Sequence, residues 1–154
     1  MQIDAVILGA TGYGGGELLY WLSRHPNVAS VRGTSRDSAG KSFASVHPNL
    51  RGIVAGDFES EIDWPPLAAR EEVVVFSALP HTELARRISD LEEKWSRAGI
   101  GQKLLLIDLS HDFRAPDSGF VYGLPEWNRP ALVRAKRIAS AGCFAHSTPR
   151  ARRS

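Results

Sequence analysis

Cysteine is almost missing from this sequence of 154 residues, which holds a single thiol at Cys143. One cysteine cannot build an internal disulfide framework, and it cannot supply a cysteine-based metal cluster. A chain without disulfides fits a reducing compartment. We therefore expect a cytoplasmic protein, and we predict no metal centre.

Long apolar runs and an excess of one charge are missing as well. No stretch is long enough to cross a bilayer, and the N-terminal sequence MQIDAVILGATG lacks the basic start and cleavage site of a signal peptide. Lys+Arg number 19 against 17 Asp+Glu, which gives a net charge of +2, and three of the arginines lie in the last five residues. Because no basic stripe with interleaved aromatic residues is present, we expect neither a nucleic-acid nor a membrane partner.

The segments that are present alternate between buried strands and amphipathic helices. Strands are predicted at residues 3–8, 28–35, 73–79, 103–110 and 135–140, and helices at 17–26 and 81–97. Residues 36–70 are expected to be loops with short strands, one around Ile53 to Phe58, and residues 114–119 and 122–130 to be loops, the second leading into a short helix. This order is typical of an α/β protein with a doubly wound parallel sheet, a Rossmann-like domain.

A glycine-rich turn, GATGYGGG, follows the first predicted strand and precedes the first helix. Gly9 would permit the sharp turn, Gly12 would let a pyrophosphate approach the backbone, and Gly15 would allow close packing of helix on strand. The phosphates would then lie at the positive end of the helix. The turn therefore favours dinucleotide binding, and the alternative is a tight turn without a ligand.

The end of the second predicted strand bears on the choice of cofactor. Domains that prefer NAD place an acidic residue there, whereas a 2′-phosphate calls for arginine and small polar groups. Here Ser35 and Arg36 stand at the end of the strand, and Asp37 comes only afterwards. The sequence predicts NADP(H), with Arg36 as a solvated loop cation in the alternative reading.

A Tyr-x-x-x-Lys pair, which short-chain dehydrogenases need for proton transfer, is missing. The residues four positions after Tyr13, Tyr20 and Tyr122 are Glu17, Arg24 and Glu126. The sequence therefore disfavours that chemistry.

Cys143 follows Ala141 and Gly142 directly after the last predicted strand. A thiol at the start of a helix has a lowered pKa and is a competent nucleophile. Taken alone, a single cysteine is more often a small buried apolar residue, so both interpretations stay open at this point.

The chain resembles the N-acetyl-gamma-glutamyl-phosphate reductases of arginine biosynthesis. The resemblance runs from about Ile3 to Ala145 and rests on short segments in a shared order: GATGYGGGEL (9–18), TSR and AGK (34–36 and 39–41), HPNLRG (47–52), ALPH (78–81), IDLSHDFR (107–114), YGLPEWNR (122–129) and AGCFA (141–145). Related reductases that act on N-acetylaminoadipyl phosphate in lysine biosynthesis share most of these segments. The resemblance leaves both substrates open.

The resemblance implies a mechanism in which Cys143 attacks the carbonyl of a small acyl phosphate and phosphate leaves. NADPH then reduces the thioester, and the product is N-acetylglutamate semialdehyde. Residues 1–145 would be the dinucleotide-binding domain, a second α+β domain would supply a histidine base, and family members are homo-oligomers. The implied cofactor-binding residues are Gly9, Ala10, Thr11, Gly12, Tyr13, Gly15, Ser35, Arg36, Ala78, Leu79 and Pro80.

Four residues near this chemistry keep alternative interpretations. Arg114 would bind the substrate phosphate or carboxylate, or else would pair structurally with Asp108 or Asp112. His81 lies near the expected nicotinamide, although helix capping and packing are at least as reasonable. His47 and Arg51 are placed in a loop near the site without a role.

The sequence departs from the family pattern in a few places. His111 replaces the usual small residue of the DLSxDFR segment, Ala141 stands where proline is common, and the loop between Arg114 and Val121 is short. Residues 146–154 are expected to be a basic, unstructured tail of a truncated or frame-shifted product, inactive on its own. The alternative from another class is a non-catalytic NADP-binding module.

Overall fold

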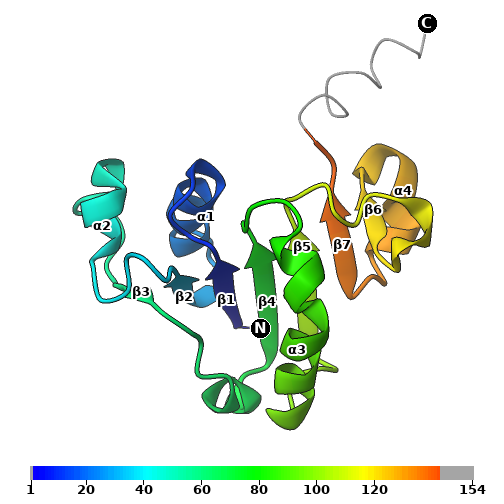
Figure 1. Cartoon of the computed structure of the whole chain (residues 1–154), viewed down its shortest axis with the longest axis horizontal. Helices are drawn as coiled ribbons and strands as arrows, with labels where there is room; N and C mark the ends of the chain where they lie inside the picture. Colours follow the sequence, from blue (N-terminus) through cyan, green and yellow to red (C-terminus); the bar gives the residue numbers. More distant parts are fainter. Residues whose placement is uncertain (1, 143–154) are drawn as a thin grey trace, which may run out of the picture.

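The computed structural model describes residues 2–142, which form one parallel sheet with helices on both faces (Figure 1). The strands are β1 (Ile3–Leu8), β2 (Val28–Thr34), β3 (Phe58–Glu59), β4 (Glu72–Ser77), β5 (Leu104–Asp108), β6 (Val121–Gly123) and β7 (Arg137–Ser140). The α-helices are α1 (Tyr13–Ser23), α2 (Phe43–Val46), α3 (Glu83–Arg97) and α4 (Pro125–Leu132), and 3₁₀ helices span Pro48–Leu50, Pro65–Ala69 and Pro116–Ser118. The strand order is β3-β2-β1-β4-β5-β7-β6, and each pair of neighbouring strands is parallel. This confirms the predicted doubly wound sheet.

The carboxyl ends of these strands share one edge of the sheet, at the top of Figure 1. The chain leaves β1 toward β2 on one side and leaves β4 toward β5 on the other side. The strand order therefore reverses between β1 and β4. In open α/β sheets the ligand crevice lies at this reversal, outside the carboxyl ends of the strands.

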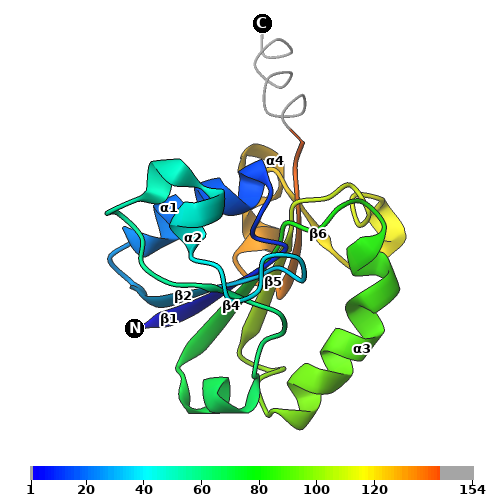
Figure 2. The same cartoon turned by 60° about the vertical axis from the view of Figure 1, so that its left-hand side comes forward.

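Figure 2 shows α1 on one face of the sheet and α3 on the other. One hydrophobic core lies under each of these helices. Successive side chains of a strand point to opposite faces, so Val6 of β1 belongs to the core under α3 and Ile7 to the core under α1. Both side chains are fully buried. Burial on both faces explains why this strand is a continuous apolar run in the sequence.

The amphipathic helix predicted at residues 81–97 is present as α3, which begins two residues later. Leu84, Leu91 and Trp95 of its apolar stripe are buried. At its end Gly99 has a φ of +71°, and the N–H of Ile100 donates to the carbonyl oxygen of Trp95 at 3.0 Å. This left-handed glycine and its hydrogen bond are a Schellman motif. Among residues 2–142, no helix has the length and apolarity needed to cross a membrane.

The sheet differs from the prediction at its two outer strands. The strand expected around Ile53 to Phe58 is confined to Phe58–Glu59 at one edge. At the other edge β6 lies within a region that the sequence assigned to loops, and β7 is inserted between β6 and β5. A strand of three residues is too short to show a period of two, so the sequence carries no signal for it.

Candidate functional site

The turn between β1 and α1 adopts the geometry that its glycine spacing predicts. Gly9 has a φ of +78°, and a Cβ at this position would lie 3.1 Å from the carbonyl oxygen of Ala78. A Cβ on Gly15 would lie 2.6 Å from backbone atoms of Ala10, so glycine is what lets α1 pack against the turn. A Cβ on Gly12 would meet no atom of the described chain within 4 Å. The turn is therefore tight at both ends and open at its centre.

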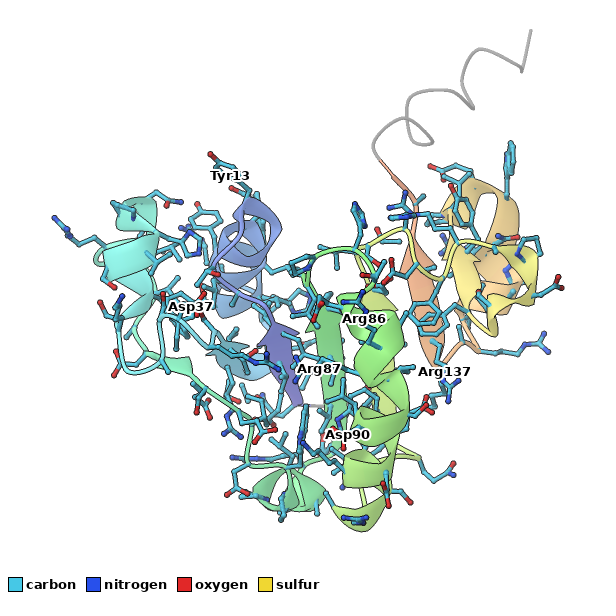
Figure 3. All side chains as sticks on the ribbon, viewed as in Figure 1. Tyr13, Asp37, Arg86, Arg87, Asp90 and Arg137 are labelled. Atoms are coloured by element: carbon cyan, nitrogen blue, oxygen red, sulfur yellow. The ribbon has the colours of Figure 1, made fainter. Side chains whose placement is uncertain are left out.

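The N-terminus of α1 has no capping group from the described chain. Gly12 is the N-cap, no side chain caps the helix, and its first turn holds no acidic residue. The first intrahelical bond runs from the N–H of Gly16 to the carbonyl oxygen of Gly12, so the preceding amides have no partner within the helix. Tyr13 is 98% exposed and points away from the sheet (Figure 3). This helix end is an open, positively polarised site for an anion.

His47 fastens the glycine turn from a distant part of the sequence. Its Nε2 lies 2.8 Å from the carbonyl oxygen of Ala10, and because a carbonyl only accepts, Nε2–H is the donor. Its ring also packs on α1, since a Cβ on Gly16 would lie 2.8 Å from Nδ1. The sequence offered no signal for this positioning role, because the two partners are 37 residues apart.

The end of β2 is joined to the same turn. The hydroxyl of Thr34 accepts the N–H of Gly9 at 3.2 Å, and its carbonyl oxygen accepts the N–H of Ala10 at 2.9 Å. Ser35 and Arg36 follow directly, and the Ser35 hydroxyl accepts a backbone N–H of its own loop. Arg36 is exposed and forms no ion pair within residues 2–142. The guanidinium that the sequence assigned to a 2′-phosphate is thus available.

A cleft of about 400 Å³ runs along the carboxyl edge between the ends of β1 and β2 and the helix α3. Six of the predicted cofactor-binding residues line it, namely Gly9, Thr11, Ser35, Arg36, Leu79 and Pro80. Ala10, Gly12, Tyr13 and Gly15 belong to the turn itself and do not line this cleft. The structure therefore brings the turn, the end of β2 and the segment after β4 to one place.

Charged residues that the sequence reasoning missed also line the cleft. Arg87 enters it from α3, and Glu83 and Leu91 line the same side at four-residue spacing on that helix. In Figure 3, Arg87 lies between α3 and β1, whereas Asp37 lies beyond β1. Helical periodicity could have predicted the position of Arg87 from the sequence, because Arg87 lies three residues after Leu84 of the apolar stripe of α3.

Glu61, which also lines the cleft, remains ionised at neutral pH. A hydrogen bond of 2.9 Å from Lys94 Nζ, followed by the charge of Lys94, holds the pKa of Glu61 below its usual value. The cleft therefore carries carboxylates at Asp37, Glu61 and Glu83 beside the two arginines. A ligand with separated anionic groups would have to meet the arginines and avoid these carboxylates.

A second hollow of about 260 Å³ continues from the first toward the end of β5. Ala78, Leu79 and Pro80 line it together with Gly14 and Ser110. Leu79, Pro80 and His81 line both spaces. Leu79 and Pro80, two of the three predicted residues after β4, therefore form the wall between the two halves of the edge together with His81, and Ala78 lines the second hollow alone.

Arg114 does not pair with either aspartate that the sequence suggested as its structural partner. Its Nε donates to the carbonyl oxygen of Ser140 at 2.9 Å, and Nη2 donates to that of Leu109 at 3.4 Å. Asp108 instead accepts hydrogen bonds from Ser110, and Asp112 accepts the backbone N–H of residue 82. The structural alternative was wrong in its partners, because the guanidinium lies across backbone carbonyls of β7 and of the loop after β5. The substrate-binding role of Arg114 stays a prediction.

The predicted nucleophile Cys143 and the expected tail lie outside the described residues. The last described strand, β7, ends at Ser140 and is parallel to β5. Its carboxyl end therefore lies at the same edge of the sheet as both hollows.

Comparison with protein families gives one match that spans most of the chain. The model described as "Semialdehyde dehydrogenase, NAD binding domain" matches residues 4–135. A solved structure of aspartate semialdehyde dehydrogenase with NADP from Candida albicans superposes with a TM-score of 0.51 at 21% identity, covering 92% of this chain and 43% of that one. At this identity the structural match supports the fold alone.

Curated relatives are more similar in sequence. The N-acetyl-gamma-glutamyl-phosphate reductases of Methanosphaera stadtmanae and Christiangramia forsetii are 36% and 40% identical over 93% and 94% of this chain. The LysW-L-2-aminoadipate 6-phosphate reductase of Deinococcus radiodurans is 35% identical over 92% of it. The chain covers 43%, 41% and 42% of the lengths of these three proteins. It therefore spans about two fifths of the relatives that it matches.

Proposed function

Because the chain belongs to the family of the semialdehyde dehydrogenase NAD-binding domain, we propose that it binds NADP(H) along the carboxyl edge of its sheet. We further propose that it forms the dinucleotide-binding part of an N-acetyl-gamma-glutamyl-phosphate reductase. The observation that carries the proposal is the single cleft that joins the glycine turn, Ser35 and Arg36, and the segment after β4. The names of the Methanosphaera stadtmanae and Christiangramia forsetii relatives support the choice of reaction.

The residues present fit a nicotinamide dinucleotide in its phosphate region. The pyrophosphate would lie over Gly12, where space is open, and would accept hydrogen bonds from the free amides at the start of α1. The 2′-phosphate would lie against Ser35 and Arg36, because β2 ends in Thr34 rather than in a carboxylate that would bind the ribose hydroxyls. The second hollow, beyond Leu79 and Pro80, would receive the nicotinamide end.

Titration with NADPH and with NADH tests the choice of cofactor directly. We expect tighter binding of NADPH, and we expect Arg36→Ala to weaken NADPH about 10- to 100-fold, as loss of a charge-assisted hydrogen bond implies. The affinity for NADH, which lacks the 2′-phosphate, should change little in the same variant. The matched control is Arg134→Ala, which removes an exposed arginine that lines neither hollow. Equal losses for both nucleotides, or for both variants, would count against a 2′-phosphate site at Arg36.

The proposed reaction converts an acyl phosphate into an aldehyde. The thiolate of Cys143 would attack the carbonyl carbon with release of phosphate, and the bound cofactor would supply a hydride to the resulting thioester. Collapse of the reduced adduct would return the thiol and release N-acetylglutamate semialdehyde. Within the described residues, the role left to the chain is to bind and orient the dinucleotide at the edge where β7 ends.

Complementation tests the reaction, since the chain spans about two fifths of its relatives. The chain should be co-expressed with the remaining C-terminal portion of the Methanosphaera stadtmanae relative. NADPH should form from NADP⁺, phosphate and N-acetylglutamate semialdehyde when both parts are present. Activity should vanish with Cys143→Ser while NADPH binding persists. Binding of NADPH without turnover in any combination would favour a non-catalytic module.

A second candidate function rests on the lysine-pathway relatives. The Deinococcus radiodurans reductase is nearly as similar to this chain as the arginine-pathway reductases are. The reaction would be the same, with a 2-aminoadipate 6-phosphate in place of N-acetyl-gamma-glutamyl phosphate. Assay of the complemented enzyme with both semialdehydes separates the two, and we expect faster turnover of the acetylglutamate compound.

A further inference from the structure

His81 and His111 face each other at the carboxyl edge, beside the hollows described above. Their Nδ1 atoms are 2.6 Å apart, and the rings meet edge to face with centroids 4.0 Å apart. His81 precedes α3 and His111 follows β5, so the pair brings two neighbouring loops together. Two imidazole nitrogens at this distance must share a proton, unless a cation takes its place.

The carboxylate of Asp112 lies against the same pair. Its Oδ1 is 3.9 Å from Nδ1 of His111 and accepts the N–H of Thr82 at 2.9 Å. The Asp112 side chain is only 2% exposed, and its Oδ2 has no hydrogen-bond partner within the described residues. A buried carboxylate oxygen without a donor costs free energy, and a bound cation is one of the groups that relieve this cost.

We propose that His81, His111 and Asp112 form a binding site for a divalent transition-metal cation such as Zn²⁺. One ligand atom from each residue lies within 4.8 Å of the other two. Two neutral imidazoles and one carboxylate are the donors that Zn²⁺, Co²⁺ and Ni²⁺ accept. This site is absent from the interpretation of the sequence, which considered only cysteine as a source of metal ligands.

The geometry needs only small adjustments to hold such an ion. A tetrahedral zinc with Zn–N bonds of about 2.0–2.1 Å keeps its nitrogens about 3.3 Å apart, so the rings must separate slightly. His111 can make this movement, because its side chain is 60% exposed. Three protein ligands leave a fourth position for water, which is the arrangement of an open zinc site.

His81 and His111 come from two separate segments of the sequence. His111 belongs to IDLSHDFR (107–114), and His81 belongs to ALPH (78–81). The proposal goes beyond the proposed function and does not rest on it, because the three ligands lie outside the glycine turn and Arg36 is not involved. His81 does line both hollows, so the ion would lie on the wall between them.

Metal titration of the full chain without nucleotide tests the site. We expect one Co²⁺ per chain with the visible absorption of a site that contains nitrogen ligands, and displacement of this Co²⁺ by Zn²⁺. His111→Ser removes one imidazole ligand and should weaken Zn²⁺ binding at least about 10-fold, since loss of an outer-shell partner alone costs about 10- to 100-fold. Asp112→Asn, which keeps an acceptor for Thr82, should weaken it similarly.

Two controls separate this site from the other metal ligands of the chain. His25→Ser removes an exposed histidine that takes no part in the pair, and Cys143→Ser removes the only thiol. Both should bind Zn²⁺ as the unaltered chain does. Unchanged affinity in His111→Ser, with its fold verified by circular dichroism, would overturn the proposal. So would loss of the ion in Cys143→Ser alone, because the metal would then be held by the thiol.

Discussion

The turns after β1 and after β4 both place the N-terminus of a helix at the same edge of the sheet. The two helix N-termini differ in whether the protein supplies a carboxylate to them. α1 begins after Gly12 with no side-chain cap and no acidic residue in its first turn. α3 begins after Thr82, whose N–H is bound by the carboxylate of Asp112, and Glu83 stands in its first turn. Because negative charge stabilises a helix N-terminus, α3 is already satisfied by the protein's own carboxylates. The difference favours α1 as the helix that receives the phosphates of a ligand.

The two turns also differ in how they reach a left-handed backbone. The turn after β1 uses Gly9 at a φ of +78°, where glycine meets no steric penalty. The turn after β4 uses Thr82 at a φ of +69°, the only non-glycine residue with positive φ within residues 2–142. A β-branched side chain is unfavourable there. One turn is therefore relaxed and open, and the other is strained and held by Asp112.

The largest effect should come from filling the space between α1 and its turn. Gly15→Ala should lower the free energy of unfolding by about 2–3 kcal/mol, since a Cβ 2.6 Å from the Ala10 backbone forces the two apart. Urea denaturation measures this loss. Gly14→Ala is the matched control, because its Cβ would lie 3.5 Å from Leu109, an ordinary contact. If both alanines had the same effect, close packing would not be the reason for the third glycine.

The second largest effect should come from a substitution at the N-terminus of α1 that changes NADPH affinity and the free energy of unfolding in opposite directions. In Gly12→Ser the new hydroxyl can cap α1, so the free energy of unfolding should rise by a few tenths of a kcal/mol. The same hydroxyl would occupy the amides that the phosphates need, and NADPH affinity should fall about 10-fold, or about 1.4 kcal/mol. Thermal melts and NADPH titration measure the two quantities. Undiminished affinity in a more stable variant would move the phosphate site away from α1.

The sequence predicted the relaxed turn far better than the strained one. The residue type and the spacing of Gly9, Gly12 and Gly15 already indicate a tight turn. The strand before it and the helix after it could therefore be placed from the sequence. The turn after β4 shows only Pro80 and a helical stripe, because the constraint on Thr82 comes from Asp112, which is 30 residues away in sequence. Partners at such distances follow from the topology of the sheet, which local patterns do not determine.

The same reason explains the parts of the site that were missed. Arg36 could be placed near the glycine turn from the sequence, because it directly follows a recognisable strand, and it lines the cleft. His47 and the pair of His81 and His111 acquire their contacts only when loops 30 or more residues apart meet at the edge. Arg114 was assigned to the wrong structural partners because both aspartates near it in sequence already accept other hydrogen bonds.

Removing the carboxylate that caps α3 should make the two helix ends alike. Asp112→Ala leaves the N–H of Thr82 without its partner, and we expect a loss of about 1 kcal/mol in the free energy of unfolding. Urea denaturation without added metal measures it. Asp117→Ala, which removes an exposed carboxylate of a 3₁₀ helix, should change the stability by less. A loss no larger in Asp112→Ala than in this control would mean that α3 does not depend on its cap.

The smallest effect should come from relaxing the strained turn itself. Thr82→Gly removes the side chain that the left-handed backbone disfavours, which should raise the free energy of unfolding by about 1–2 kcal/mol. Glycine also makes the unfolded chain more flexible, and this lowers the free energy of unfolding by about 0.4–1 kcal/mol. Thr82→Asn avoids most of that offset, because asparagine tolerates the left-handed region and is less flexible than glycine when unfolded. Urea denaturation should therefore show a small gain for glycine and an equal or larger gain for asparagine. A loss in both variants would show that the threonine side chain contributes contacts worth more than the strain, and the turn after β4 would then be as relaxed in energy as the turn after β1.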